Sequence, residues 1–387
     1  MTHGHVLLCG PAEPAQIFDC ADQHDLAPGF GGVAVNLLAR ALASRGWRVT
    51  AVSTSPDVAR PWRHREANVE VVLVPMRARG RDRARDLFKY ERRALIDEIR
   101  RQQPDIVHAH WTYEFALAAL GSGLPTLVTA RDAPITILRH FHDPYRAARL
   151  AMAIWVRLKN PDMTANSPYM AEQWVREMRW HRDIAVIPNI GPFDPLDHVP
   201  ENVPGQRVVT VADSSQRKNV RGALEAWPIV LQSFPDAELH LVGDGLESTG
   251  DLAVWAEECG LQQQVFWHGF LGREGVKRAI DAATLLLHPS LEESLGNTLL
   301  EAMALEVPVV GGDASGAVPW TVGQGGEMTD VQSPSALAAT VVHLLGDPER
   351  CARLGAAGKR RVADVFSPEA VASAYENQYA AVLRGTS

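Results

Sequence analysis

Short apolar segments alternate with helical patterns along most of this chain, and that alternation restricts the possible folds more than any other feature. In the first half, helical spacing of apolar residues marks three segments, at residues 33–45, 86–102 and 114–120. Apolar runs of strand length lie before, between and after them. Repeated strand–helix units predict an α/β fold with a parallel, doubly wound sheet. The predicted strands of this half lie at residues 5–9, 49–53, 69–74, 105–108, 126–130, 163–166 and 184–187.

A proline-rich segment divides the chain, and the same alternation restarts after it. Residues 188–204 contain five prolines, which is typical of an interdomain linker. We expect one Rossmann-like domain over residues 1–190, a linker over 191–206, a second Rossmann-like domain over 207–366, and a helix over 367–387 that crosses back to the first domain. Ligands in such sheets bind beyond the carboxyl ends of strands, which predicts a site in a cleft between the domains. The predicted strands of the second domain lie at residues 208–211, 239–242, 265–267, 285–288 and 307–310.

The composition favours a cytoplasmic protein. A chain of 387 residues is long enough to form two hydrophobic cores. No apolar run approaches the roughly 20 residues that a membrane-spanning helix needs. The N-terminus shows neither the basic region nor the cleavage site of a secretory signal. The cysteines have no C-x-x-C spacing and are expected to be reduced thiols; they are Cys9, Cys20, Cys259 and Cys351.

Charge is distributed unevenly between the two halves. Residues 1–188 hold 25 Lys and Arg against 20 Asp and Glu, a net charge of +5, and the remainder holds 13 against 26, a net charge of −13. The two values sum to the overall −8. This asymmetry predicts different partners for the two halves, and the overall acidity argues against nucleic acid.

Two basic segments of the first half also carry apolar residues, at residues 77–93 and 144–159. Basic helices with an apolar face suit the anionic surface of a membrane, so one hypothesis is peripheral contact with its inner face. The alternative is a solvated face whose charge is balanced by Asp82, Asp86 and Glu91. The apolar residues are Leu87, Phe88, Tyr90, Ile154, Trp155 and Leu158, and the basic ones are Arg77, Arg79, Arg81, Arg83, Arg85, Lys89, Arg92, Arg93, Arg146, Arg149, Arg157 and Lys159.

Residues 288–304 hold the strongest indication of a ligand site. A buried strand ends at His288, and a helix pattern follows a turn at Glu293 to Asn297. The N–H groups of the first helical turn suit a phosphate group. The carboxylates of Glu293 and Glu301 can each accept two hydrogen bonds, as a sugar diol requires. The alternative interpretation is an ordinary strand–helix unit with solvated glutamates.

Other strand ends carry further candidates for binding. Gly31 and Gly32 precede a helix, where glycine lets the backbone approach a diphosphate, or they form an ordinary turn. The motif is not G-x-G-x-x-G and no acidic residue ends the second strand, which disfavours a dinucleotide oxidoreductase. Lys218 precedes a helix and can neutralise a diphosphate, unless it is a solvated surface lysine. The backbone of His268–Phe270 follows another strand and can read the edge of a base.

The first domain also ends two strands with polar side chains. His108 and His110 are two residues apart, but no third ligand group accompanies them, so we expect no metal. Arg131 and Asp132 end the next strand and are predicted to face the cleft; a surface ion pair is the alternative. Guanidinium does not deprotonate in proteins, so Arg131 cannot act as a base.

Taken in order, these motifs resemble the GT-B glycosyltransferases of family 4, the group 1 enzymes of retaining type. The resemblance spans nearly the whole chain. It rests on Gly31-Gly32 with the following helix, Asp105 to His110, Ile187-Pro188-Asn189, Lys218-Asn219, Leu241 to Gly245, Pro289-Ser290 through Glu293 and Gly296 to Glu301-Ala302-Met303-Ala304, Pro308 to Val310, and Gly316 to Pro319.

The resemblance implies specific roles for these residues. Glu301 would bind the nucleotide ribose, Glu293 the donor hexose and Lys218 the diphosphate, and the first domain would bind the acceptor. Glu293, Lys218 and Arg131 would be the catalytic residues. No metal or other cofactor would be required beyond the nucleoside-diphosphate sugar as co-substrate. The remaining donor-binding residues would be Gly31, Gly32, Arg217, Gly243, His268, Gly269, Phe270, Ser294, Leu295, Gly296, Asn297, Thr298 and Leu299, and the acceptor side would hold His110, Arg131 and Asp132.

The chain departs from the family pattern at two positions. Ala212 and Asp213 stand where the family usually has an arginine, so either Arg217 replaces that arginine or Asp213 points away. Arg131 stands where the family often has a histidine.

The expected activity is transfer of a hexose from a UDP- or GDP-sugar to a hydroxyl acceptor, a glycan or lipid-linked glycan in bacterial polysaccharide biosynthesis. The alternatives are a nucleotide-sugar epimerase or phosphorylase-like enzyme of the same fold, and a non-catalytic donor-binding homologue.

Overall fold

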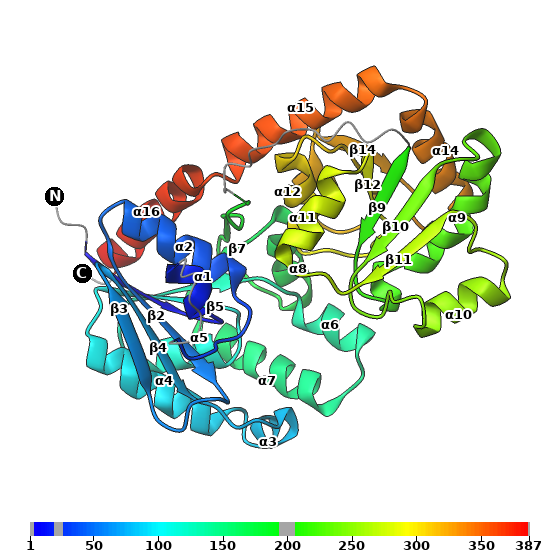
Figure 1. The fold of residues 1–387 in the computed structure, drawn as a ribbon. Helices are drawn as coiled ribbons and strands as arrows, with labels where there is room; N and C mark the ends of the chain where they lie inside the picture. Colours follow the sequence, from blue (N-terminus) through cyan, green and yellow to red (C-terminus); the bar gives the residue numbers. More distant parts are fainter. Residues whose placement is uncertain (1–3, 19–25, 193–205, 386–387) are drawn as a thin grey trace. The chain divides into compact units, whose positions relative to one another are not determined.

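The chain folds into two compact α/β units, described here from a computed structural model that covers residues 4–18, 26–192 and 206–385 (Figure 1). One unit comprises Met1–Ile190 with Pro368–Ser387, and the other comprises Gly191–Ser367. The C-terminal helix therefore groups with the N-terminal unit. Most of the expected linker at residues 191–206 lies outside the described residues, as does Cys20. The described cysteines Cys9, Cys259 and Cys351 are free thiols.

The N-terminal unit is built on one sheet with the strand order β3-β4-β2-β1-β5-β6-β7-β8. Its described pairs are parallel except that of β3 with β4, which is antiparallel. The strands are β1 His5–Cys9, β2 Arg48–Ser55, β3 Trp62–Glu66, β4 Val69–Pro75, β5 Ile106–His110, β6 Thr126–Ala130, β7 Asp162–Ala165 and β8 Ala185–Val186. The helices are α1 Pro14–Phe18, α2 Val33–Ser44, α3 Gly80–Arg85, α4 Lys89–Gln102, α5 Glu114–Ser122, α6 Pro134–His140, α7 Pro144–Lys159, α8 Pro168–Glu177 and α16 Pro368–Gly385.

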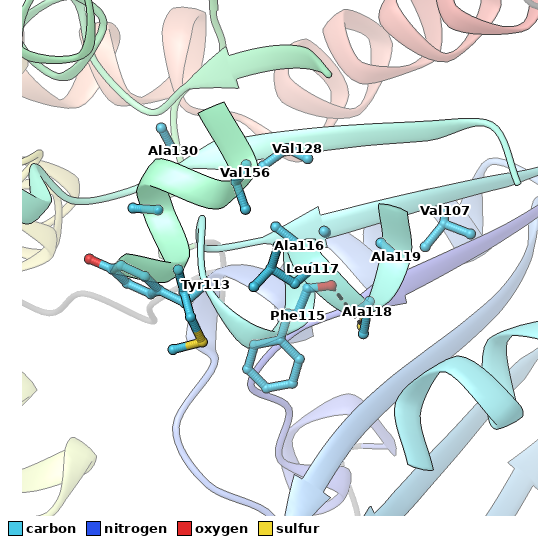
Figure 2. Packing of buried hydrophobic residues seen from close by; sticks show 14 of the residues in the cluster. Val107, Tyr113, Phe115, Ala116, Leu117, Ala118, Ala119, Val128, Ala130 and Val156 are labelled. Atoms are coloured by element: carbon cyan, nitrogen blue, oxygen red, sulfur yellow. Dashed lines mark hydrogen bonds between the residues drawn. The ribbon is translucent and has the colours of Figure 1, made fainter. Parts of the chain in front are cut away.

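Helix α5 lies at the centre of the N-terminal core (Figure 2). Phe115, Ala116 and Ala118 are fully buried, because this helix is apolar almost all round and packs between the sheet and neighbouring helices. The buried residues of β5 and β6, among them Val107 and Val128, line the same core.

The basic segment of the N-terminal unit differs from the prediction of one helix over residues 86–102. The chain forms α3 and then α4, with a break at Leu87 and Phe88, whose φ angles of 52° and 58° are left-handed. Phe88 is buried at this corner. The Arg77 side chain fixes the corner by binding Asp86 and Glu91, with Nη2 2.8 and 2.7 Å from their carboxylates. These tertiary contacts outweigh the helical pattern of the sequence.

The C-terminal unit has the strand order β11-β10-β9-β12-β13-β14, and its described strand pairs are parallel. Strand β12 lies between β9 and β13, so the turns after these three strands emerge at one edge of the sheet. The strands are β9 Arg207–Val211, β10 Glu238–Val242, β11 Val265–Gly269, β12 Leu285–His288, β13 Val309–Gly312 and β14 Gly326–Thr329. The helices are η2 Gln216–Lys218, α9 Val220–Ser233, α10 Asp251–Glu258, α11 Arg273–Asp281, α12 Asn297–Ala304, α13 Val318–Val322, α14 Pro334–Leu345 and α15 Pro348–Val365.

Two strands were not predicted, because neither is an apolar run. Strand β3 has the sequence Trp-Arg-His-Arg-Glu and pairs with β4 at the end of its sheet. Strand β14 is Gly-Glu-Met-Thr and occupies an end of the other sheet. Strands at sheet ends need less apolar surface than central strands, so their sequences carry a weaker signal.

Candidate active site

The turn between β12 and α12 has a backbone that only glycine accommodates at its last position. Gly296 has φ 86° and precedes the first residue of α12. A side chain there would come within 2.6 Å of Leu299, which is fully buried. Left-handed backbone and lack of space together explain the glycine. The side chains of Leu295 and Leu299 belong to the core, so these two predicted residues can contact a ligand only through their backbone.

The following strand and its loop hold this turn in place. Glu293 N donates to Ser315 O at 3.3 Å, and Ala317 N donates to Glu293 O at 2.9 Å. The Thr321 hydroxyl donates to Leu295 O at 2.7 Å. Ser315 and Thr321 were not among the predicted site residues. The available signal was that Ser315 follows β13, the neighbour of β12 in the sheet, and that Thr321 lies on the next helix, α13.

Glu293 is a buried carboxylate that lies beside Lys218, Arg217 and the His288 ring. Its Oε1 lies 2.5 Å from Lys218 Nζ, 3.4 Å from Arg217 Nη1 and 3.5 Å from His288 Nε2. Burial alone would raise the pKa of Glu293, but the His288 ring and the charges of Lys218 and Arg217 hold that pKa well below its usual range. Glu293 is therefore an anion at neutral pH and an acceptor of hydrogen bonds.

The turn after β9 brings Lys218 to Glu293. Lys218 ends the short 3₁₀ helix η2, and Asn219 takes a left-handed conformation with φ 52°. The Asn219 side-chain amide donates to Pro289 O at 3.2 Å and to Val331 O at 2.8 Å. Leu291 N donates to Arg217 O at 2.8 Å. Strands β9 and β12 are neighbours, and these hydrogen bonds connect the turn after β9, which carries Lys218, to the turn after β12, which carries Glu293.

Arg217 and Asp213 have different contacts at the position where the family arginine is missing. Arg217 Nη1 donates to Glu292 O at 2.8 Å and faces the Glu293 carboxylate. Asp213 Oδ1 accepts a hydrogen bond from Ser215 N at 2.9 Å. Burial would raise the pKa of Asp213, but the Ser215 hydrogen bonds and the charges of Lys218 and Arg217 lower it. The Asp213 carboxylate is thus an anion that also stabilises its own turn.

Glu301 lies one turn into α12, on the same helix face as Asn297. Burial raises the pKa of Glu301, and the charge of Arg273 offsets only part of that effect. The two glutamates of the predicted site therefore differ electrostatically. Neighbouring cations lower the pKa of Glu293, whereas burial raises the pKa of Glu301.

Gly243 and Gly269 form close backbone contacts at the ends of β10 and β11. Gly243 N donates to Gly269 O at 2.8 Å. A side chain on Gly243 would meet Ala212 O at 1.8 Å, so close packing of the turns after β9 and β10 requires glycine. The His268 ring lies 2.8 Å from the His240 ring, measured between Nε2 and Nδ1, and stacks on it. Phe270 is 76% exposed. Among these predicted residues, Phe270 offers the most accessible side chain.

The glycine loop before α2 leaves open space at its tip. Gly31 has φ 56°, and a side chain there would meet no atom within 4 Å. Gly32 has φ 83°, and a side chain there would lie 2.0 Å from Pro11 O. Gly32 is therefore required by packing within the unit, whereas Gly31 leaves the backbone accessible to a ligand.

Arg131 and His110 contact each other at the ends of β6 and β5. Arg131 Nη2 and Nε lie 2.6 and 3.2 Å from His110 Nδ1, and Nη1 binds the side chain of Asn189. Burial and the neighbouring His108 and Arg131 hold the pKa of His110 well below its usual range. His110 is thus neutral, with its proton on Nε2. This buried nitrogen has no hydrogen-bond partner among the described residues.

The side chains of His108 and Asp132 form hydrogen bonds within the N-terminal unit. His108 Nδ1 lies 2.8 Å from the Tyr379 hydroxyl, and its Nε2 lies 2.7 Å from the Thr129 hydroxyl. Asp132 accepts a hydrogen bond from the Tyr113 hydroxyl at 2.8 Å. Within residues 4–18, 26–192 and 206–385, no three His, Cys, Asp or Glu side chains come together as a metal site.

Comparison with solved structures defines the class of this fold. The structure is similar to sucrose-phosphate synthase from Thermosynechococcus elongatus, with a TM-score of 0.75, 21% sequence identity, and coverage of 99% of this chain and 100% of that one. The fold is GT-B, which confirms the expectation drawn from the family resemblance.

Sequence matches give the family. Residues 31–190 match the model of glycosyltransferase family 4, and residues 198–361 match that of the glycosyl transferases group 1. The chain is 27% identical over 321 residues to N-acetyl-alpha-D-glucosaminyl L-malate synthase of Bacillus anthracis, covering 75% of this chain and 78% of the relative. It is 28% identical over 225 residues to the lipopolysaccharide core biosynthesis glycosyltransferase LpsE of Rhizobium meliloti, covering 56% of this chain and 64% of that relative. The chain belongs to the group 1, family 4 glycosyltransferases.

Proposed function

We propose that this glycosyltransferase moves a hexose from a UDP- or GDP-sugar to a hydroxyl of a glycan or lipid-linked glycan, with retention of the anomeric configuration. The single observation that carries the proposal is the cluster of Lys218 and Arg217 on Glu293, beside the N-terminus of α12. Two cations and the amides of a helix start suit a diphosphate, and a carboxylate beside them suits sugar hydroxyls. Glu301 would bind the ribose.

In the proposed reaction, the acceptor oxygen bonds to the anomeric carbon while the bond from that carbon to the diphosphate breaks. The acceptor proton passes to an oxygen of the departing diphosphate, on the same face of the sugar. Lys218, Arg217 and the amides of α12 stabilise the negative charge that develops on this leaving group. Glu293 is unsuited as a general base, because its pKa is held well below its usual range.

The acceptor is proposed to bind to the N-terminal unit at His110, Arg131 and Asp132. The buried His110 Nε2 offers a hydrogen-bond donor, and Arg131 offers a fixed positive charge. A relative whose name places it in lipopolysaccharide core biosynthesis supports a glycan or lipid-linked acceptor in bacterial polysaccharide biosynthesis.

The donor is tested first by turnover. Purified protein is incubated with UDP- and GDP-sugars and a lysate as the source of acceptor, and release of UDP or GDP is measured with the anomeric configuration of the product. Release that depends on acceptor supports transfer. Release of an altered free sugar without acceptor indicates an epimerase, and formation of a sugar phosphate from glycan and phosphate indicates a phosphorylase-like enzyme. Binding without any consumption indicates a non-catalytic homologue.

No metal is proposed to take part, since Lys218 and Arg217 supply the positive charge that a metal would otherwise give. Activity is therefore expected to survive a chelator such as EDTA. Loss of activity that added Mg²⁺ or Mn²⁺ restores would contradict this part of the proposal.

A further inference from the structure

Helix α7 presents an apolar stripe to solvent. Ile154 is 43% exposed, Trp155 40% and Leu158 69%. Ala147 and Ala151 continue the stripe toward the start of the helix, since residues three and four apart lie on one face. A helix on the surface of a globular protein usually has polar residues on its outer face. The inner face of α7 is apolar as well, and is formed by Met152, Ala153 and Val156.

Helices α4 and α3 carry positive charge beside α7. The guanidinium carbon of Arg92, on α4, lies 4.8 Å from the centre of the Trp155 ring. Helix α3 packs against α7 and carries Arg81 and Arg85, whose side chains are 68% and 78% exposed. Helix α7 itself contains four basic residues and no acidic one; Arg149 packs on the Tyr113 ring and Arg146 pairs with Asp143, which leaves Arg157 and Lys159 toward the end of the helix.

Most of the acidic side chains in the basic segment next to α7 are already paired with arginine. In residues 77–93 there are eight basic and three acidic residues, the latter being Asp82, Asp86 and Glu91. Arg77 binds both Asp86 and the fully buried Glu91. Asp82 remains, 3.6 Å from Arg85. The exposed charge of the segment is therefore positive.

We propose that this surface binds the anionic headgroup region of a lipid bilayer. We call it the α7 face and define it as Ile154, Trp155 and Leu158 with Arg81, Arg85 and Arg92. An anionic bilayer offers apolar acyl chains for the stripe, an interface that favours tryptophan, and negative charges for the arginines. A second copy of the chain is a poorer partner, because pairing two α7 faces brings their arginines together. In the described part of the chain, no helix has the length and apolar character to cross a membrane.

The proposal goes beyond sugar transfer and can be tested without turnover. The full chain is sedimented with vesicles of phosphatidylglycerol and phosphatidylcholine, and with vesicles of phosphatidylcholine alone. Binding is expected only with phosphatidylglycerol, and to weaken as salt is raised. The double variant Ile154→Ser, Leu158→Ser is expected to weaken binding about tenfold or more, because it removes apolar side chains that would be buried in the bilayer. Val254→Ser is the matched control, because Val254 is 48% exposed on α10 of the other unit.

A second pair of variants tests the charges independently of the apolar stripe. Arg81→Glu and Arg85→Glu are each expected to weaken binding about fivefold to tenfold at low salt. Equal binding to neutral vesicles, no binding to anionic ones, or binding that neither set of variants changes would each overturn the proposal. So would a dimer in solution that dissociates in the Ile154→Ser, Leu158→Ser variant, since the α7 face would then be an interface between copies.

Discussion

Lys218 and Arg217 both approach Glu293, but the distances rank their contributions. Lys218 Nζ lies 2.5 Å from the carboxylate, whereas Arg217 lies 3.4 Å away and donates its shorter bond to the Glu292 carbonyl. Lys218→Ala is therefore expected to lower kcat/KM for the donor about 10²- to 10³-fold, the usual effect of removing a charge-stabilising group. Arg217→Lys, which keeps the charge, is expected to lose less.

Steady-state release of UDP or GDP measures these effects. Lys359→Ala is the control, because Lys359 forms a comparable 2.7 Å pair with Glu306 on the surface of the same unit. If Lys218→Ala kept the activity of the control, Lys218 would not hold the diphosphate.

The contrast between the two glutamates predicts a dependence on pH. Burial raises the pKa of Glu301, so its carboxylate becomes protonated at pH values above the ordinary value of about 4.3. Glu293 stays ionised over the same range because its pKa is held low. Affinity for the nucleotide is therefore expected to fall as the pH decreases toward the raised pKa of Glu301, through lost hydrogen bonds to the ribose.

Calorimetric titration with UDP and GDP from pH 8 to pH 5 measures this change. In Glu301→Gln the dependence is expected to flatten, with affinity at pH 8 about tenfold lower. Titration of the nucleotide itself is common to both proteins and cancels in the comparison. An unchanged pH profile in Glu301→Gln would exclude Glu301 as the titrating group.

Residue positions could be predicted from the sequence where the strand order dictates them. Glu293 and Lys218 follow strands that are neighbours in the sheet, and their turns meet. The direction of individual side chains could not be predicted. Nothing in the sequence indicates that Asp213 accepts from Ser215, or that His268 stacks on His240. Such choices depend on rotamers and on neighbours far apart in the chain.

At the level of secondary structure, α16 stabilises the N-terminal unit through a few buried polar contacts. The Tyr379 hydroxyl lies 2.8 Å from His108 Nδ1, and both side chains are fully buried. Tyr379→Phe leaves that nitrogen without its partner and is expected to lower the free energy of unfolding by about 1–3 kcal/mol. Urea unfolding measures the loss. Asn377→Ala, at an exposed position of the same helix, is the control and is expected to change little.

A stability of Tyr379→Phe equal to that of the control would contradict this role for the hydroxyl.

A second variant tests the packing of α16 on the N-terminal unit through its partly exposed contacts. Glu376 binds Arg45 with distances of 2.9 and 2.6 Å and accepts from Trp47 Nε1 at 3.0 Å. These groups are partly exposed, so Glu376→Ala is expected to cost only about 1 kcal/mol.

Elements with strong apolar periodicity could be predicted from the sequence, and those fixed by tertiary contacts could not. Central strands such as β5 and β12 are apolar runs that appear where they were expected. The break between α3 and α4 depends on the Arg77 ion pairs and on burial of Phe88. A helical pattern contains no information about such a corner.

Each of the two units of the whole molecule has its own sheet and its own core, so ligand binding can stabilise one without the other. Lys218, Glu293 and Glu301 all belong to the unit Gly191–Ser367. This unit also belongs to the acidic part of the chain, so the cations beside Glu293 are local exceptions in a negatively charged domain. A nucleoside diphosphate is therefore expected to bind this unit only through its specific contacts with Lys218, Arg217 and the start of α12.

Hydrogen exchange with and without nucleotide tests this expectation on the intact chain. At a UDP or GDP concentration 100 times Kd, bound protein is stabilised by about 2.7 kcal/mol. Protection is expected to rise at η2 and α12, whose amides and side chains form the proposed diphosphate site. The sheet of the N-terminal unit should keep its exchange rates, apart from the open loop at Gly31 and Gly32. Protection confined to the N-terminal unit would move the nucleotide site away from Glu293, and an equal response in Lys218→Ala would show that the diphosphate is held elsewhere.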